Sequence, residues 1–270
     1  MEVRAMTDRL RTNNVTVAGN PHAERTLVFA HGFGSNQQFW RFITPAYEKD
    51  HRLVLYDMTG CGGSDIKEFS RLRYGGLEGH AQDLIDICDV LGMRQVSVIS
   101  HSISTMISAL AYLQRPALFE KFVWLGATPC LCNHGAYVGG FEAAELDAIY
   151  EAISIDFFGW LRGAAPAAMK NPNRPELAAE HMQCVAAMRP DIALPLARMT
   201  FQMDLRHKMS RISLPVLLLQ PTDDDFVPAE VGRYLQKHLP HAQLSLVPSE
   251  GHFPQLSHPD AMLAAMAGFL

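Results

Sequence analysis

The chain has few cysteines and no long apolar run, and both shortages exclude classes of protein. Its five cysteines include no CxxC pair, and Cys130 and Cys132 have no His or Cys partner at metal spacing. We therefore expect reduced thiols and no metal. No run of about 18 apolar residues could span a bilayer, and residues 1–14 lack the apolar core of a secretion signal. These absences predict a protein of the cytoplasm that can also occur in the nucleus.

Strong charge of either sign is also missing. The formal net charge is −5, and the 23 Lys and Arg residues are scattered without a basic stripe. This pattern argues against nucleic acid or an anionic membrane as a partner and favours a small neutral or apolar ligand. With 270 residues, of which 48% are hydrophobic, the chain can form one α/β domain with a continuous core. We expect a monomer.

Short apolar runs rich in β-branched residues alternate with helical patterns over much of the chain. The helical patterns include residues 77–91 and 103–114. Strands that alternate with helices imply right-handed crossovers and a mostly parallel sheet, which defines the doubly wound α/β class. The predicted strands are 26–30, 52–56, 95–99, 122–125, 216–219 and 244–247.

The alternation stops between residues 132 and 206, where no strand-like run occurs. This predicts a helical lid at 132–206, inserted into a core formed by 1–131 and 207–270. Because proline removes an N–H group and clashes inside a helix, Pro190 and Pro195 predict several short helices in place of a long bundle. The helical stretches are 142–153, 157–169 and 176–188.

A candidate nucleophile follows the predicted strand 95–99. The chain there reads SHSIS at 100–104 and continues directly into a helical pattern. In a nucleophile elbow the middle serine, here Ser102, occupies a strained strand-to-helix turn, and its flanking residues must be small. The usual pattern is GxSxG, so Ser100 and Ser104 depart from it. The alternative interpretation is a strand that ends in several serines and has no catalytic role. Residues elsewhere in the chain must decide between a nucleophile elbow and this alternative.

Candidate partners for Ser102 follow two later strands. A serine hydroxyl needs a base within hydrogen-bond reach and an acid that orients the base. His252 follows the last predicted strand, and Asp223, Asp224 and Asp225 follow the one before it. The order Ser, Asp, His along the chain is typical of α/β-hydrolases. We take Asp224 as the acid and interpret the other two as a helix cap or loop charges.

A glycine-rich loop after the strand 26–30 is suited to hold an oxyanion, which forms in acyl transfer and needs preorganised donors. The loop reads HGFG at 31–34; we expect one donor to be the Phe33 N–H and the other to be the Ile103 N–H. A phosphate-binding loop is the rival interpretation of this turn and of residues 60–64. Neither has the Lys-Ser/Thr pair of a Walker loop or a full GxGxxG, so nucleotide binding is not expected.

With these residues in place, the sequence resembles, over nearly its whole length, the α/β-hydrolases that include the plant strigolactone and karrikin receptors and the bacterial stress regulator RsbQ. A serine at position 104 is typical of that branch, whereas Ser100 departs from its glycine. The resemblance supports Asp224, which aligns within QPTDDDFVP, as the acid. The matching segments are HGFGSNQQFW (31–40), LYDMTGCGGSD (55–65), LEGHAQDLIDICDVLG (77–92), SHSIS (100–104), YVGGFE (137–142), MRPDIAL (188–194), TFQMD (200–204) and PSEGHFPQLSHPD (248–260).

The resemblance implies the α/β-hydrolase fold, with a mostly parallel eight-stranded sheet flanked by helices and a V-shaped lid of four helices over an apolar pocket. Leu131 and Ala164 stand where plant members often have tyrosine and phenylalanine, so we expect a larger and less polar pocket. Aromatic residues at such spacing are also common in plain cores. The pocket residues carried over by motif are Phe33, His101, Phe141, Trp160 and Phe201.

These residues and the resemblance together predict a serine hydrolase for a small ester or butenolide lactone, without a cofactor. A receptor that hydrolyses slowly and acts through a protein partner would use the same catalytic residues, so it remains a second hypothesis. In the family resembled, the catalytic histidine can be modified by a ring fragment of the ligand, which implies the same for His252. A pseudo-hydrolase that only binds is a third hypothesis, and an intact triad argues against it.

Overall fold

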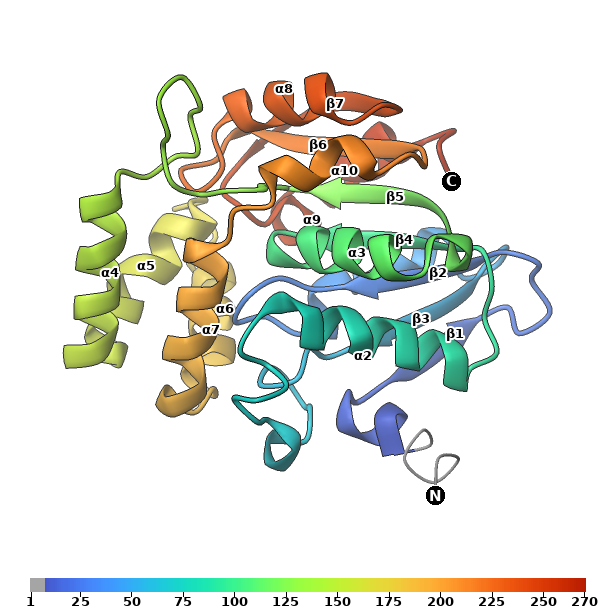
Figure 1. The fold of residues 1–270 in the computed structure, drawn as a ribbon, viewed down its shortest axis with the longest axis horizontal. Coiled ribbons are helices and arrows are strands. Elements are labelled where there is room, and N and C mark those ends of the chain that lie inside the picture. Colours follow the sequence, from blue (N-terminus) through green and yellow to red (C-terminus); the bar gives the residue numbers. More distant parts are fainter. Residues whose placement is uncertain (1–7) are drawn as a thin grey trace.

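One sheet of seven strands forms the centre of the computed structural model, which describes residues 8–270 (Figure 1). The strand order is β1-β3-β2-β4-β5-β6-β7. β1 is antiparallel to β3 and every other pairing is parallel, so the predicted α/β class is confirmed. The strands are β1 (Thr16–Gly19), β2 (Thr26–Ala30), β3 (Arg52–Tyr56), β4 (Val96–His101), β5 (Phe119–Leu125), β6 (Val216–Asp223) and β7 (Ala242–Glu250).

The expectation of eight strands was wrong for the described residues. β1 lies at the edge of the sheet, is four residues long and is mostly exposed, so its sequence carries no apolar alternation. Just before it, residues 8–12 are helical and Asn14 takes a left-handed φ of +45°. Residues 8–14 therefore turn away at this edge and do not form a further strand.

Helices cover both faces of the sheet, and neighbouring residues of one strand pack toward opposite sides. Val98 of β4 belongs to the core beneath α2, α3 and α8, whereas Ile99 belongs to the core beneath α10. Burial on both faces explains why the central strands are apolar throughout. The covering helices are α2 (Leu77–Val90), α3 (Ile103–Gln114), α8 (Ala229–His238), the short α9 (Pro254–Ser257) and α10 (Pro259–Met266).

Four further helices are inserted between β5 and β6 and stand beside the carboxyl ends of the strands (Figure 1). They lie close to the three helical stretches expected from the sequence, with a fourth helix following them. The inserted helices are α4 (Ala143–Ile155), α5 (Phe157–Met169), α6 (Pro175–Ala186) and α7 (Pro190–Gln202). Short 3₁₀ turns occur at η1 (Gln37–Trp40), η2 (Thr44–Ala46), η3 (Ile66–Glu68), η4 (Pro116–Leu118) and η5 (Arg206–Arg211).

The two prolines near the end of this insertion behave differently. Pro190 begins α7, where the first helical position needs no N–H donor. Pro195 lies inside α7, which continues to Gln202, so the expectation that this proline interrupts the helix was wrong. Ile192 and Leu196 of α7 are buried, and their packing offsets the missing backbone hydrogen bond.

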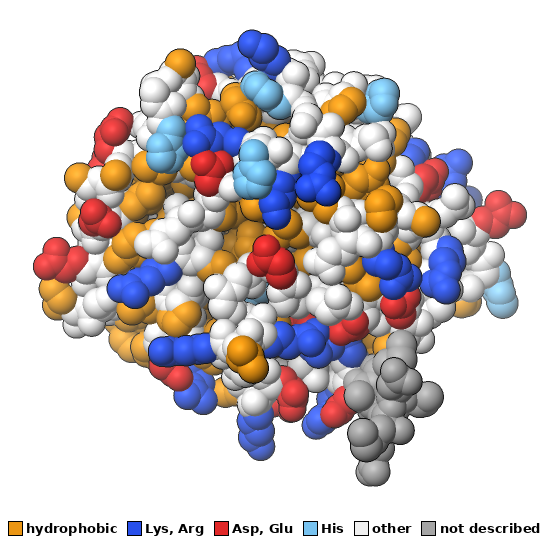
Figure 2. Space-filling model, viewed as in Figure 1, with side chains coloured by type: hydrophobic (Ala, Val, Ile, Leu, Met, Phe, Trp, Pro, Cys, Tyr) orange, Lys and Arg blue, Asp and Glu red, His pale blue; other side chains and the backbone are white. Residues whose placement is uncertain are grey.

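The surface combines both signs of charge. On the face seen in Figure 2, Lys and Arg side chains lie interspersed with Asp and Glu, and apolar groups lie between them. Within residues 8–270, no helix has the length and apolar character required to cross a membrane.

Buried His80 of α2 should make stability depend on pH. Its ring lies 4.7 Å from the Tyr74 ring between centroids, and in the part of the chain that the structure describes neither ring nitrogen has a hydrogen-bond partner. Burial lowers the pKa of His80 from 6.5 to about 4. Between these values the unfolded chain binds a proton that the folded chain does not, so stability is lost as the pH falls below 6.5. Protonation of this histidine in the unfolded chain should lower the free energy of unfolding by about 2 kcal/mol between about pH 7 and about pH 5.

Urea unfolding at both pH values would measure this effect. In His80→Leu the difference in the free energy of unfolding between the two pH values should be smaller by about 2 kcal/mol. In His22→Gln the difference should stay as in the wild type, because His22 is exposed. An unchanged pH dependence in His80→Leu would show that His80 is protonated equally well in the folded and unfolded states.

Candidate active site

Ser102 occupies a strained turn between β4 and α3. Its backbone has φ 53° and ψ −125°, a left-handed φ that non-glycine residues rarely adopt and that concentrates at functional sites. The Ser102 N–H donates to the Leu125 carbonyl of the neighbouring strand at 2.9 Å, which holds the turn against the sheet. The strand, the turn and the helix together have the geometry of a nucleophile elbow.

Small residues surround this turn because the backbone segments approach closely. A Cβ atom on Gly32 would lie 3.1 Å from the Ser102 Cβ and 2.6 Å from the His101 Nδ1. The Ser104 hydroxyl donates to the His31 carbonyl, so this serine ties α3 to the loop after β2. The Ser100 hydroxyl is buried and has no hydrogen-bond partner among residues 8–270, and nothing in the structure explains why a serine stands there.

The loops after β6 and β7 bring an acid and a base together. The His252 Nδ1–H donates to Asp224 Oδ2 at 2.7 Å, and both side chains are buried. Asp224 Oδ1 accepts the N–H groups of Phe226 at 2.9 Å and Val227 at 3.2 Å. These bonds fix the carboxylate in place and set the histidine tautomer, with Nε2 free to accept a proton.

The two neighbouring aspartates have another role. The carboxylates of Asp223 and Asp225 are 59% and 61% exposed and pair with Lys170 Nζ at 2.6 and 2.8 Å. This ion pair joins the end of α5 to the loop after β6. Of the three consecutive aspartates, Asp224 is the one that contacts His252.

Backbone contacts hold the histidine loop against both the core and the insertion. The His252 N–H donates to the Ala168 carbonyl of α5, and its carbonyl accepts from His101 Nε2, both at 2.8 Å. Burial, followed by the nearby His252, holds the pKa of His101 well below its usual range, so His101 is neutral. A Cβ atom on Gly126 would lie 2.9 Å from the His252 Cε1, so glycine gives the ring its space.

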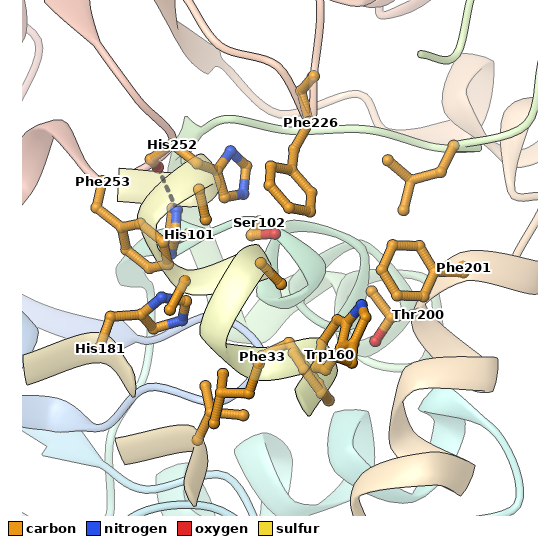
Figure 3. Close-up of a pocket in the computed structure, with 17 residues that line it drawn as sticks. Phe33, His101, Ser102, Trp160, His181, Thr200, Phe201, Phe226, His252 and Phe253 are labelled. Atoms are coloured by element: carbon orange, nitrogen blue, oxygen red, sulfur yellow. Dashed lines mark hydrogen bonds between the residues drawn. The ribbon is translucent and has the colours of Figure 1, made fainter. Parts of the chain in front are cut away.

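A mostly apolar cavity opens above Ser102 (Figure 3). Besides Ser102 and His252, six residues expected from the sequence line it: Phe33, His101, Leu131, Trp160, Ala164 and Phe201. Ile103 has a fully buried side chain in the core; as the first residue of α3, it has an N–H without a partner in its own helix.

Phe141 is not among the residues that line the cavity, so its expected place in the wall is corrected. Its ring packs against Phe201 at 6.1 Å and Phe226 at 5.9 Å between centroids. These two residues line the cavity themselves. Phe141 therefore supports the wall from behind.

Sequence reasoning missed several lining residues, most of them on the inserted helices. The spacing of Trp160, Ala164 and Ala168 along one face of α5 is helical, and this period could have indicated Ala168. Phe226 and Phe253 stand next to the triad loops, which is a second usable signal. The missed lining residues are Leu161, Ala165, Ala168, His181, Val185, Thr200, Phe226, Val227 and Phe253.

One cluster of metal-type ligands lies outside the cavity. Ligand atoms of Cys130, His134 and Asp204 lie within 4.8 Å of one another, although nothing in the sequence spacing indicated it. Both Asp204 oxygens already bind the Arg206 guanidinium, at 2.9 and 2.6 Å. We interpret this cluster as the surroundings of an ion pair and propose no metal there.

A serine on a strained strand-to-helix turn and a histidine oriented by a buried aspartate define a hydrolase of the nucleophile-elbow class. Comparison with known proteins agrees with this geometry. Residues 27–265 match the Alpha/beta hydrolase family, and the chain belongs to that family. The resemblance inferred from the sequence motifs is therefore confirmed.

The most informative relatives cover almost the whole chain. The chain is 38% identical to a probable esterase of Oryza sativa subsp. japonica, over 89% of each chain. It is 36% identical to a strigolactone esterase of Arabidopsis thaliana, over 97% of this chain and 96% of that one. Among solved structures, a hydrolase from Oleispira antarctica has a TM-score of 0.94 and 32% identity, covering 98% of this chain and 96% of its own.

Proposed function

We propose that this protein hydrolyses a small apolar ester or a butenolide lactone of the strigolactone type, with Ser102 as nucleophile. The observation that carries the proposal is the 2.7 Å contact between His252 and Asp224 at the wall of an apolar cavity that also contains Ser102. Relatives named as a strigolactone esterase, a probable esterase and a karrikin receptor support this substrate class.

In the proposed reaction the Ser102 Oγ attacks the carbonyl carbon, and His252 Nε2 takes the serine proton. Asp224 stabilises the imidazolium that results. The N–H groups of Phe33 and Ile103 bind the carbonyl oxygen as it becomes negative. His252 then gives its proton to the leaving oxygen, and water releases the acyl group by the same steps in reverse order. Side chains of the protein carry every proton in this scheme, so it requires no cofactor.

A slow hydrolase that signals through a protein partner is the second candidate function. The bond from the His252 N–H to the Ala168 carbonyl favours it, because it links the catalytic loop to α5. A ligand fragment bound to His252 would then shift the inserted helices through this hydrogen bond. This proposal treats residues 132–206 as a lid on a core of 1–131 and 207–270.

We also propose that the protein works as a monomer in the cytoplasm, with the nucleus as a further compartment. All five cysteines are free thiols in the structure, which supports a reducing compartment.

Hydrolysis of a fluorogenic butenolide analogue tests the proposal, with intact-protein mass spectrometry of the same sample. Protein blocked beforehand with a serine-reactive phosphonate is the control. Many turnovers per molecule, lost in the blocked protein, would support the enzyme. One turnover with a lasting adduct on His252 would support the receptor. Turnover of p-nitrophenyl esters alone would contradict the butenolide assignment, and failure to react with the phosphonate would favour a protein that only binds.

A further inference from the structure

We propose that His181 forms a polar subsite in the active cavity and selects ligands that carry a hydroxyl group away from the reacting carbonyl. His181 belongs to α6 and lines the cavity that contains Ser102 (Figure 3). This inference rests on the proposed hydrolysis of an ester or lactone and defines more narrowly which substrates the cavity prefers.

The first observation is a buried nitrogen without a partner. His181 is only 7% exposed, and its Nδ1 makes no hydrogen bond within the described residues. Leaving such a group unpaired costs about 1–3 kcal/mol, so buried polar groups in folded proteins are nearly always satisfied. Because the His181 ring lines the cavity, a ligand that fills the cavity can supply the missing partner. The catalytic scheme does not use His181, so catalysis leaves this nitrogen unexplained.

The second observation concerns the proton on the ring. Burial, followed by the nearby His252, lowers the pKa of His181 to about 4, so the ring is neutral near neutral pH. The backbone of Ala165 contacts the ring and favours its proton. A neutral imidazole carries one N–H donor and one bare nitrogen that accepts, and a hydroxyl group can pair with either. A neutral ring of this kind suits a hydroxyl group and does not attract a carboxylate.

The third observation is that α6 is fixed before any ligand binds. Glu180, next to His181, forms two hydrogen bonds with the Arg41 guanidinium of the core, at 2.6 and 2.8 Å. One turn along α6, Val185 packs so closely on the oxyanion loop that a Cβ atom on Gly34 would lie 2.5 Å from it. A polar group held in place in this way discriminates better than a mobile one.

Aromatic rings separate this subsite from the triad. The Phe253 ring lies 4.5 Å from the His181 ring and 4.9 Å from the His101 ring between centroids. A ligand whose carbonyl lies at Ser102 would therefore pass an apolar wall before it reaches the His181 ring. The chemistry that fits is an apolar body with the scissile ester at one end and a hydroxyl at the other.

Paired substrates test the inference. We would use p-nitrophenyl esters of increasing acyl length, each with and without a terminal hydroxyl, and measure kcat/KM. At the length that reaches His181, the wild type should prefer the hydroxylated ester by about tenfold or more. His181→Leu should lose this preference, whereas His181→Asn should keep part of it, because a side-chain amide also offers a donor and an acceptor to a hydroxyl group.

Thr200→Val is the matched control, because Thr200 also lines the cavity and the change removes a second polar group, which donates to the Leu196 carbonyl at 2.8 Å, while His181 stays in place. The Thr200→Val variant should prefer the hydroxylated ester by the same factor as the wild type. Equal preference in wild type and His181→Leu at every acyl length would overturn the subsite while leaving the esterase intact. If no ester is turned over, the proposed function fails. In that case, the ¹⁵N NMR signals of the His181 ring still test the subsite. A chemical-shift change with the hydroxylated alcohol or acid, and none with its apolar counterpart, would support the subsite. No chemical-shift change with either would overturn it.

Discussion

Replacement of Ser102 by alanine should lower kcat for ester hydrolysis by about 10⁴- to 10⁶-fold. The loss is large because no other hydroxyl in the cavity can take over: the Thr200 hydroxyl is bonded to the Leu196 carbonyl. Alanine accepts the φ of 53° at this position no worse than serine does, so the turn and the cavity should persist. Initial rates with a p-nitrophenyl ester, together with the affinity for an unreactive analogue, would separate lost chemistry from lost binding.

Ser100→Ala is a suitable comparison for this variant, because it also removes one serine hydroxyl from the elbow. The Ser100 hydroxyl is buried and bonds to none of the described residues, so its removal should change kcat by less than about twofold. Equal losses in the two variants would mean that damage to the elbow, and not removal of the nucleophile, explains the effect of Ser102→Ala.

Asp224→Asn should lower kcat by about 10⁴-fold with little change in structure. The carboxylate now accepts the His252 Nδ1–H at 2.7 Å. An asparagine that keeps its oxygen toward the N–H groups of Phe226 and Val227 would turn its NH₂ group toward His252. The ring would then carry its proton on Nε2, and Nε2 could not accept the proton of Ser102. The measurement is kcat as a function of pH, with a thermal melt to verify folding.

Asp225→Asn offers a control of the same chemistry one residue away. Its carboxylate is exposed and pairs with Lys170, so activity should stay close to that of the wild type. If Asp225→Asn loses activity and Asp224→Asn keeps it, the assignment of the acid is wrong.

Much of the site could be predicted because its residues occur in short local patterns. Ser102 stands between an apolar strand and a helical pattern, and His252 follows the last strand. Residues at the carboxyl ends of parallel strands meet at one edge of the sheet, so their order along the chain was enough to bring them together. The choice among three consecutive aspartates depended on the resemblance, since each has the same local context.

Other features depended on contacts between distant segments. Phe141 shares the aromatic character of the cavity wall, yet Phe201 and Phe226 stand between it and the cavity. The number of strands was overestimated because a missing edge strand leaves no mark on the apolar pattern of the others. His181 was overlooked because a histidine in a helical stretch looks the same in sequence whether it faces solvent or a cavity.

The sequence by itself determined the α/β class and the family, and it predicted the nucleophile and its base, because strand periodicity and turn chemistry are local properties of the chain. Only the tertiary structure decided which aromatic rings line the cavity and that the buried His181 stands in its wall. These depend on how α5, α6 and the loops after β6 and β7 pack together, and burial and hydrogen bonding between segments far apart in the chain set that arrangement.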